Sequence, residues 1–226
     1  MEWYTVIPTC NRPKELGDLI DTLITNQVGG KERVLVINNG EPLGLYIWDR
    51  ATVIYDPDQE PHIYQMWNLG LEWAERMSTR DNGTVRPHAV AILNDDVRLP
   101  PDFAAKMTAA LRESTATIAF PNQFGASADR VNTSPGATLL HRRVTGYAFV
   151  VNGTHGIRCD ENFKWWYGDD DLDWRARCEY RGTHLVQGVT VDHLYPSQST
   201  NRSHKLTAQA ELDRATFIRK HGRAPW

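Results

Sequence analysis

The sequence predicts an α/β protein in which a mostly parallel sheet is flanked by helices. Residues 89–93 form an apolar run without alternation, which is typical of a parallel strand buried on both faces. Strand-like and helix-like segments also alternate through the first half, in the order of a parallel sheet covered by helices. Strand after strand ends in polar residues, at the sheet edge where open α/β folds bind their ligands.

The first half contains four predicted strands and two predicted helices. The strands cover residues 4–8, 33–37, 52–55 and 89–93. The first helix has apolar residues at i, i+3, i+4, i+7 and i+8 from Leu16 to Ile24, with Pro13 near its start. The second presents one apolar face between Ile63 and Met77.

The second half has a less regular pattern. We expect helices over residues 103–111 and 205–220, strands over 116–120, 144–151 and 184–191, and loops over 121–143 and 194–204. Gly146 interrupts the second of these strands, where a glycine marks a bulge or lets a ligand approach the backbone. A loop as long as 121–143 is more often functional than idle in a compact domain.

The composition is that of an ordinary soluble globular protein. The chain has 226 residues, 41% of them hydrophobic, and a formal net charge of -3, which gives no reason to expect a nucleic-acid track. No apolar run approaches the ~18 residues of a membrane span. The first residues lack a secretion signal, and the three cysteines are unclustered, so we expect a reduced, cytoplasmic protein.

The first chemical motif follows the apolar run directly, as Asn94, Asp95 and Asp96. Adjacent carboxylates repel each other unless a cation lies nearby, and a divalent ion that bridges to phosphates would supply one. The alternative is a polar loop before a helix that begins near Pro100 and Asp102. The stretch alone leaves both interpretations open.

The other strands of the first half end in the same way. Their polar ends are Thr9 and Asn11, then Asn38 and Asn39, then Asp56. Together with residues 94–96 they predict a polar crevice at the carboxyl edge of the sheet, which favours a nucleotide site. No Gly-x-Gly-x-x-Gly follows the first strand and no Gly-Lys-Ser/Thr occurs, so a dinucleotide Rossmann site and a P-loop are not supported.

A second motif combines aromatic and acidic residues at the start of a predicted helix. It reads Trp165, Trp166, Tyr167, Gly168, Asp169, Asp170, Asp171, Leu172, Asp173. An acidic helix start is one explanation. It leaves the aromatic residues unexplained, whereas a sugar site uses both kinds, rings for stacking and acids for hydroxyls. His193 ends a later strand, and a histidine there is by itself more often structural than a ligand.

In their order and spacing these motifs resemble the compact GT-A glycosyltransferases of the family-2 type. The resemblance covers nearly the whole chain and rests on residues 6–12, 36–40, 68–71, 93–96, 168–175 and 191–193. It implies a single GT-A domain, with residues 1–97 as the nucleotide-binding half and 98–226 as the acceptor and catalytic half. Asn38, Asn94 and Gly168 stand where the family usually has Asp, Asp and Glu.

The resemblance also implies roles for individual residues. Asp96 and His193 are expected to ligate Mn²⁺ or Mg²⁺. Residues expected to hold the nucleotide-sugar donor are Thr9, Asn11, Arg12, Asn38, Asn39 and Asp95, the last at the ribose or a metal-bound water. Asp169 is the expected general base, with Asp170 as its competitor. Residues expected to border the acceptor are Gly146, Trp165, Trp166 and Tyr167.

The activity implied by the resemblance is an inverting sugar transfer. The donor would be a nucleoside-diphosphate sugar, a UDP-sugar by the family's preference, and the acceptor a hydroxyl of a glycan, a protein or another molecule. Two rivals remain from the residues alone. A nucleotidyltransferase would also combine a parallel sheet, carboxylates and a metal, and a metal-dependent carbohydrate-binding module would account for the second motif without the first.

Overall fold

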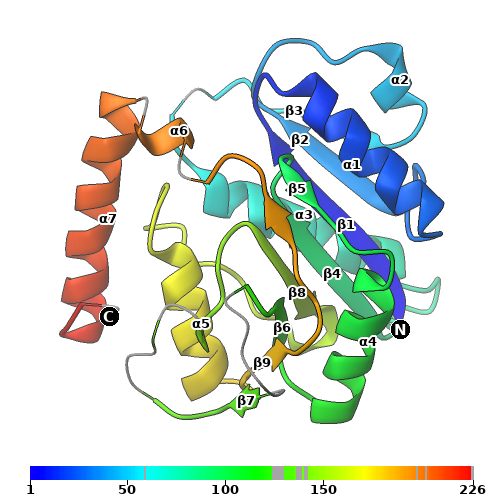
Figure 1. The fold of residues 1–226 in the computed structure, drawn as a ribbon. Coiled ribbons are helices and arrows are strands. Elements are labelled where there is room, and N and C mark those ends of the chain that lie inside the picture. The colour runs from blue at the N-terminus through cyan, green and yellow to red at the C-terminus, as the bar shows by residue number, and fades with distance from the viewer. Residues whose placement is uncertain are drawn as a thin grey trace.

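A computed structural model describes residues 1–58, 60–123, 130–135, 139, 142–196, 198–201 and 203–224. Its centre is a mixed sheet in the order β3-β2-β1-β4-β8-β6-β9-β7, with helices on both faces (Figure 1). In that order the strands are Thr52–Tyr55, Val34–Asn38, Glu2–Thr9, His88–Leu93, Ala148–Asn152, Ile118–Pro121, Thr183–Val186 and Arg130–Asn132. A separate ribbon pairs β5 (Val97–Arg98) with β10 (Asp192–His193). The α/β prediction is confirmed.

Two hydrophobic cores lie on the two faces of the sheet. Helices α1 (Pro13–Thr25) and α4 (Phe103–Ser114) cover one face, and α3 (Ile63–Ser78) and α5 (Gly168–Cys178) cover the other. Helix α7 (His204–His221) adds Phe217 to the second core, and α2 (Leu45–Trp48) adds Ile47 to the first. Because strand side chains alternate between faces, β1 supplies Ile7 to one core and Val6 to the other.

The strand directions bring distant residues to one edge. β1 to β4 are parallel, so β1 and β2 end side by side with Thr9 opposite Asn38. β8 runs antiparallel to β4, with Ala148 opposite Leu93, so the turn before β8 reaches the same edge. In the small ribbon His193 pairs with Val97. Sheet topology therefore gathers the sequence motifs at the carboxyl ends of β1, β2 and β4.

Two predicted strands were too long. The predicted strand 144–151 begins only at Ala148, because side chains from α5 take the backbone N–H groups before it: Asp173 accepts from Val144 and Asp169 from Gly146. Gly146 therefore lies in a turn and not in a strand. The predicted strand 184–191 ends at Val186, where a turn follows with Gly188 at φ +69°.

The predicted loops contain short elements. Pro121 belongs to β6, and β7 lies within the loop expected over 121–143; the rest of that prediction falls largely on residues 124–129, 136–138 and 140–141, outside the described part. Within 194–204, α6 (Gln198–Asn201) is helical, while residues 197 and 202 lie outside the described part. Sequence patterns did not predict α2, which has only four residues.

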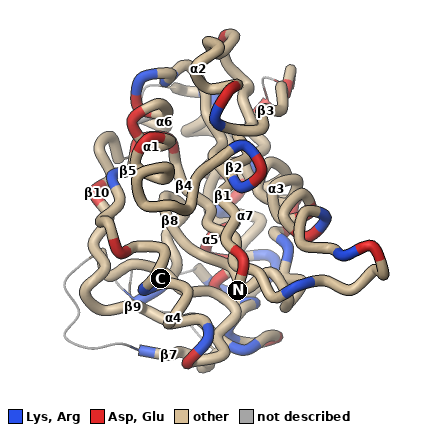
Figure 2. The backbone as a smooth tube through the Cα atoms, turned by 90° about the vertical axis from the view of Figure 1, so that its right-hand side faces the viewer, with Lys and Arg blue, Asp and Glu red and all other residues tan. Residues whose placement is uncertain are grey.

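Residues of both signs of charge are spread over the described part of the chain (Figure 2). Figure 2 shows Lys and Arg interspersed with Asp and Glu along the chain, without a continuous basic stripe over the described residues. No helix in the described part of the chain combines the length and apolarity needed to cross a bilayer.

Candidate active site

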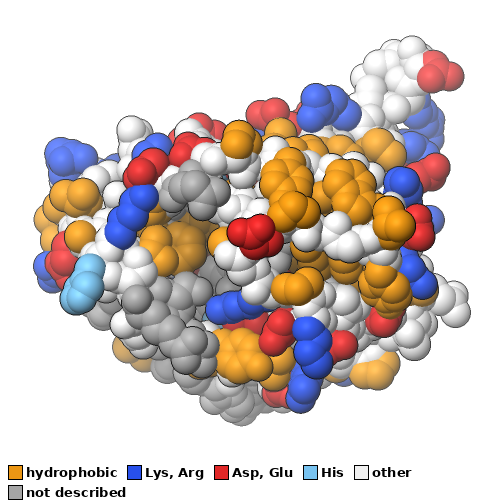
Figure 3. Space-filling view, turned by 90° about the horizontal axis from the view of Figure 1, so that it is seen from above, with side chains coloured by type: hydrophobic (Ala, Val, Ile, Leu, Met, Phe, Trp, Pro, Cys, Tyr) orange, Lys and Arg blue, Asp and Glu red, His pale blue; other side chains and the backbone are white. Residues whose placement is uncertain are grey.

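A cavity of about 640 Å³ opens at the edge of the sheet where the motifs meet. Of the predicted site residues, those that line it are Arg12, Asp96, Gly146, Trp165, Trp166, Asp169, Asp170 and His193. The cavity lining does not include Thr9, Asn11, Asn38, Asn39, Asp95 or Tyr167. Figure 3 looks onto this end of the molecule, where hydrophobic side chains lie beside charged ones.

The adjacent carboxylates after β4 share one guanidinium. Arg12 Nη1 lies 3.1 Å from Asp95 Oδ1 and 2.6 Å from Asp96 Oδ2. Thr9 donates its hydroxyl to Asp95 Oδ2 at 2.7 Å, so partners hold both oxygens of Asp95. Burial raises the pKa of Asp95 to about 6, although Thr9 and Arg12 favour its ionised form. Asp95 therefore anchors the turn after β1 to the end of β4.

Asp96 and His193 form the part of the site that suits a metal ion. Asp96 is 1% exposed, and its Oδ1 lies 3.3 Å from His193 Nε2 without a hydrogen-bond partner among the described residues. Two ligands at right angles around an octahedral ion at ~2.1 Å are about 3 Å apart, so this pair fits one ion. The His193 ring stacks on Tyr147 at 4.8 Å between centroids, and the Leu194 N–H bonds to the Asp96 carbonyl.

Asp96 and His193 would supply only part of a coordination sphere. Among the described residues no group of three or more His, Cys, Asp or Glu side chains is placed to hold an ion. Diphosphate oxygens and water complete such spheres when a divalent ion is bound through one or two protein ligands. The donor set is thus compatible with an ion that arrives with a phosphate ligand.

The asparagines after β1 and β2 hold their own turns. Asn38 is fully buried, donates to the Glu41 carbonyl at 2.9 Å and accepts from the Gly40 N–H at 3.0 Å. Asn11, at φ +58°, accepts from the Glu41 N–H at 2.7 Å. A Cβ on Gly40 would lie 2.5 Å from Asn11 Oδ1, so only glycine fits between the turns. The Asn39 N–H donates to the Thr9 carbonyl at 3.2 Å, which closes the junction.

The carboxylates at the start of α5 have different environments. Asp169 is half-buried, lines the cavity, and accepts from the Gly146 N–H at 2.9 Å. Asp170 is 6% exposed and forms an ion pair with Arg143 at 2.6 Å. Burial raises the pKa of Asp169, and burial together with the Asp169 charge raises that of Asp170 well above its ordinary value. Asp169 is the more accessible of the two to a ligand.

The residues just before α5 explain why a glycine stands at its first position. Gly168 donates its N–H to the Tyr64 hydroxyl at 2.9 Å, and a Cβ there would lie 2.4 Å from the Tyr64 ring. A glutamate, as the resemblance would place here, has no room. Tyr167 has φ +65°, an uncommon conformation for a bulky residue, and it turns the chain into the helix. Tyr167 is 9% exposed and packs in the second core beside Phe217.

Two residues of the C-terminal segment hold the paired tryptophans, and sequence reasoning missed both. Asp213 on α7 accepts from three consecutive backbone N–H groups, Lys164 at 3.1 Å, Trp165 at 2.7 Å and Trp166 at 2.8 Å. The hydroxyl of Thr200 on α6 accepts from both indoles, at 2.8 and 3.0 Å. The one available signal was Asp213 itself, a carboxylate one turn before Phe217 on the buried face of α7.

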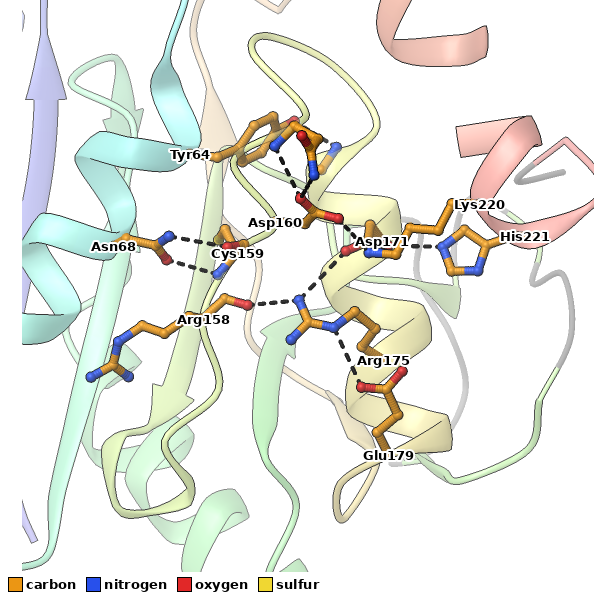
Figure 4. A network of polar contacts seen from close by, with 12 residues as sticks. Tyr64, Asn68, Arg158, Cys159, Asp160, Asp171, Arg175, Glu179, Lys220 and His221 are labelled. Atoms are coloured by element: carbon orange, nitrogen blue, oxygen red, sulfur yellow. Dashed lines mark hydrogen bonds and ion pairs between the residues drawn. The ribbon is translucent and has the colours of Figure 1, made fainter. Parts of the chain in front are cut away.

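The remaining acids of the second motif are structural. Asp171 is fully buried between α5 and α7, 2.7 Å from Lys220 Nζ and 2.8 Å from His221 Nε2 (Figure 4). Arg175 reaches the Asp171 carboxylate at 3.5 Å. Asp173 accepts from Arg177 at 2.8 Å and from the backbone before β8. These contacts fix α5 and with it the position of Asp169.

Comparisons with known proteins identify the architecture. No family model matches the sequence, and no curated protein does. Among solved structures, residues 1–349 of S. aureus TarS match with a TM-score of 0.61 at 11% identity, over 98% of this chain and 72% of that one. The complex of that fragment with UDP-GlcNAc gives 0.60 at 12%, over 99% and 74%. GalNAc-T7 with UDP, GalNAc and Mn²⁺ gives 0.58 at 11%, over 85% and 44%.

The chain has the GT-A fold. At these identities the likeness concerns the fold alone, and the chain spans 44% of a longer TarS structure. Within the GT-A fold the cavity lies at the carboxyl edge of the sheet, with Asp96 and His193 on one side and Asp169 on α5 on the other. Arg12 and the paired tryptophans also line this cavity.

Proposed function

We propose that the protein is a glycosyltransferase that moves a sugar from a nucleoside-diphosphate sugar, a UDP-sugar, to an acceptor hydroxyl with inversion of the anomeric carbon. The observation that carries the proposal is one cavity lined by a metal-compatible pair, Asp96 and His193, and by a half-buried carboxylate, Asp169. The neighbours with UDP-GlcNAc and with UDP, GalNAc and Mn²⁺ support the same donor class. Residues 1–97 would hold the nucleotide and 98–226 the acceptor.

The donor's diphosphate belongs beside Asp96 and His193. These two residues would hold Mn²⁺ or Mg²⁺, which when bound neutralises charge on the departing diphosphate as a Lewis acid. Arg12 adds a fixed positive charge 2.6 Å from Asp96 and lines the same cavity. Thr9, Asn11, Asn38, Asn39 and Asp95 support this region by holding the turns after β1 and β2, and the exposed edges of those turns border the nucleoside.

Asp169 is the proposed general base. The acceptor hydroxyl attacks the anomeric carbon from the face opposite the diphosphate, its proton passes to Asp169, and the C–O bond to the diphosphate breaks. The Gly146 N–H holds one Asp169 oxygen, which orients the other for the proton. Burial raises the pKa of Asp169, which makes the carboxylate a stronger base. Asp170, next to it on α5, is held by Arg143 at 2.6 Å.

The decisive experiment separates glycosyl transfer from its rivals by the product. The purified protein is incubated with UDP-sugars and Mn²⁺, with and without candidate acceptors, and the released nucleotide is identified. Release of UDP supports the proposal. Release of pyrophosphate when a nucleoside triphosphate and a sugar phosphate are supplied would instead identify a nucleotidyltransferase. Saccharide binding without any affinity for UDP would identify a carbohydrate-binding module.

A further inference from the structure

The side chain of Thr200, on the short helix α6, accepts hydrogen bonds from two tryptophan side chains. Its Oγ1 lies 2.8 Å from Trp165 Nε1 and 3.0 Å from Trp166 Nε1, so one hydroxyl faces the indole N–H groups of two consecutive residues. An indole nitrogen can only donate, which makes the Thr200 oxygen the acceptor in both bonds. A hydroxyl oxygen has two lone pairs and one hydrogen, so both of its acceptor positions are in use.

With both acceptor positions of Thr200 Oγ1 occupied, only its hydroxyl hydrogen is left to form a further hydrogen bond. Within the described part of the chain, no group accepts a hydrogen bond from Thr200 Oγ1. Thr200 lines the 640 Å³ cavity together with Trp165 and Trp166. Because Thr200 lines the cavity, its hydroxyl is placed to donate to a ligand there, and with two indoles already bound it can no longer accept from one.

The surrounding contacts fix this hydroxyl in place. Thr207 on α7 donates to the Thr200 carbonyl at 3.1 Å, which ties α6 to α7. Asp213, on the same helix, holds the backbone of both tryptophans. The indole rings are therefore held from both ends, by Asp213 at the backbone and by Thr200 at the ring nitrogens. Their N–H groups are occupied, so toward a ligand the rings offer apolar faces.

We propose that Thr200 is a specificity-determining residue that donates its hydroxyl hydrogen to an oxygen of a bound sugar. This inference rests on the proposed function and adds to it one hydrogen bond, in which Thr200 is the donor and a sugar oxygen the acceptor. The sugar must present an acceptor, such as a hydroxyl or ring oxygen, at a position where its carbon-bound hydrogens can lie on the tryptophan rings. The oxygen belongs either to the donor sugar or to an acceptor saccharide, and binding measurements distinguish the two.

The test compares Thr200→Val, which keeps the shape but loses the hydroxyl, with Thr200→Ser, which keeps the hydroxyl. Thr216→Val is the matched control, because Thr216 is half-buried on α7 and does not line the cavity. Within the described part of the chain its hydroxyl bonds along its own helix, donating to the Leu212 carbonyl and accepting from Arg219. Tryptophan emission and near-ultraviolet circular dichroism are recorded without ligand. We expect Thr200→Val alone to alter both spectra, since two indole N–H groups lose their partner.

Calorimetry then measures two kinds of ligand with Mn²⁺ present. The donor arm compares UDP with UDP-GlcNAc, and the acceptor arm uses methyl glycosides of glucose, galactose and N-acetylglucosamine. We expect Thr200→Val to weaken the binding of the sugar ligand about three- to tenfold in one of the two arms, because one hydrogen bond is lost. The affinity for UDP should not change. Thr200→Ser and Thr216→Val should stay within about twofold of the parent protein.

The outcomes separate the inference from the proposed function. If the parent protein binds UDP but Thr200→Val and Thr200→Ser bind every sugar with the same affinity, Thr200 donates no hydrogen bond to a sugar oxygen. The inference is then overturned while the proposed function stands. If the parent protein does not bind UDP, the proposed function fails, and the methyl glycosides alone decide the role of Thr200. Weakening of a glycoside by Thr200→Val then supports it, and its absence overturns it.

Discussion

Replacing Asp213 by alanine tests how the C-terminal helix supports the site. Asp213 is 1% exposed and accepts from three backbone N–H groups at 2.7 to 3.1 Å. Each buried N–H left without a partner costs ~1–3 kcal/mol, and the variant also removes the cost of burying a charge. We therefore expect Asp213→Ala to lower the free energy of unfolding by ~3–5 kcal/mol, a large part of the ~5–15 kcal/mol typical of a domain.

The size of the effect depends on which oxygen remains. One Asp213 oxygen accepts from Trp165 and Trp166, and the other from Lys164 and Gln209. Asp213→Asn can keep the first oxygen as an acceptor, but its NH₂ then faces the Lys164 N–H, a donor against a donor, and that hydrogen bond is lost. We therefore expect about half the loss. Urea unfolding at pH 7, followed by circular dichroism, measures both variants.

An exposed acid provides the control for Asp213. Asp18 is 67% exposed and pairs with Lys14 along α1, so Asp18→Ala should change stability by under ~1 kcal/mol. A loss below ~1 kcal/mol for Asp213→Ala would refute the reasoning, because water would then have to replace the carboxylate at all three N–H groups without cost. Intact unfolding free energy with altered tryptophan emission would also contradict it.

Three further predictions concern the metal pair, the start of α5 and a buried histidine. Asp96→Ala and His193→Ala should each weaken Mn²⁺-dependent UDP binding in calorimetry while thermal unfolding stays cooperative; unchanged metal dependence in both would reject the assignment. Gly168→Ala should lose ~1–3 kcal/mol in urea unfolding, because its Cβ meets a tyrosine ring at 2.4 Å, whereas Gly44→Ala, which has open space, should not. Burial lowers the pKa of His88, so its contribution to stability is present above pH ~6.5 and lost as the pH falls. The free energy of unfolding that the parent protein has in excess of His88→Leu should therefore shrink from pH 8 to pH 5. A constant difference would contradict this.

The sequence predicted the strand ends and the helix start that carry the candidate site residues, but not the side chains that hold these segments in place. Buried apolar strands and the polar residues that follow them are local signals, and the parallel arrangement makes such ends converge, so Asp96 and the turn after β1 could be placed at one edge. Asp169 could be placed on a helix start. In the structure Asp169, Asp96 and His193 line one cavity. Their chemical roles stay predictions.

The supports could not be predicted because they depend on contacts between distant segments. The strand predicted over 144–151 begins later than expected, because carboxylates more than twenty residues away in the chain accept from the N–H groups of Val144 and Gly146. Asp213 and Thr200 reach the tryptophans across 34 to 48 residues. Gly168 departs from the motif because the Tyr64 ring, more than a hundred residues away in the chain, fills the space that its side chain would need.

The most direct test of the central claim compares Asp169→Asn with Asp170→Asn. The measurements are the rate of UDP release from the UDP-sugar that the parent protein uses, and the affinity for UDP with Mn²⁺. If Asp169 is the base, Asp169→Asn keeps UDP affinity but loses ~10²–10⁴-fold in turnover, because an amide cannot take up the proton. Asp170→Asn should lose less, since its ion pair with Arg143 only shapes the surroundings. Near-normal turnover in Asp169→Asn, or a product of retained anomeric configuration, would contradict the proposed single displacement.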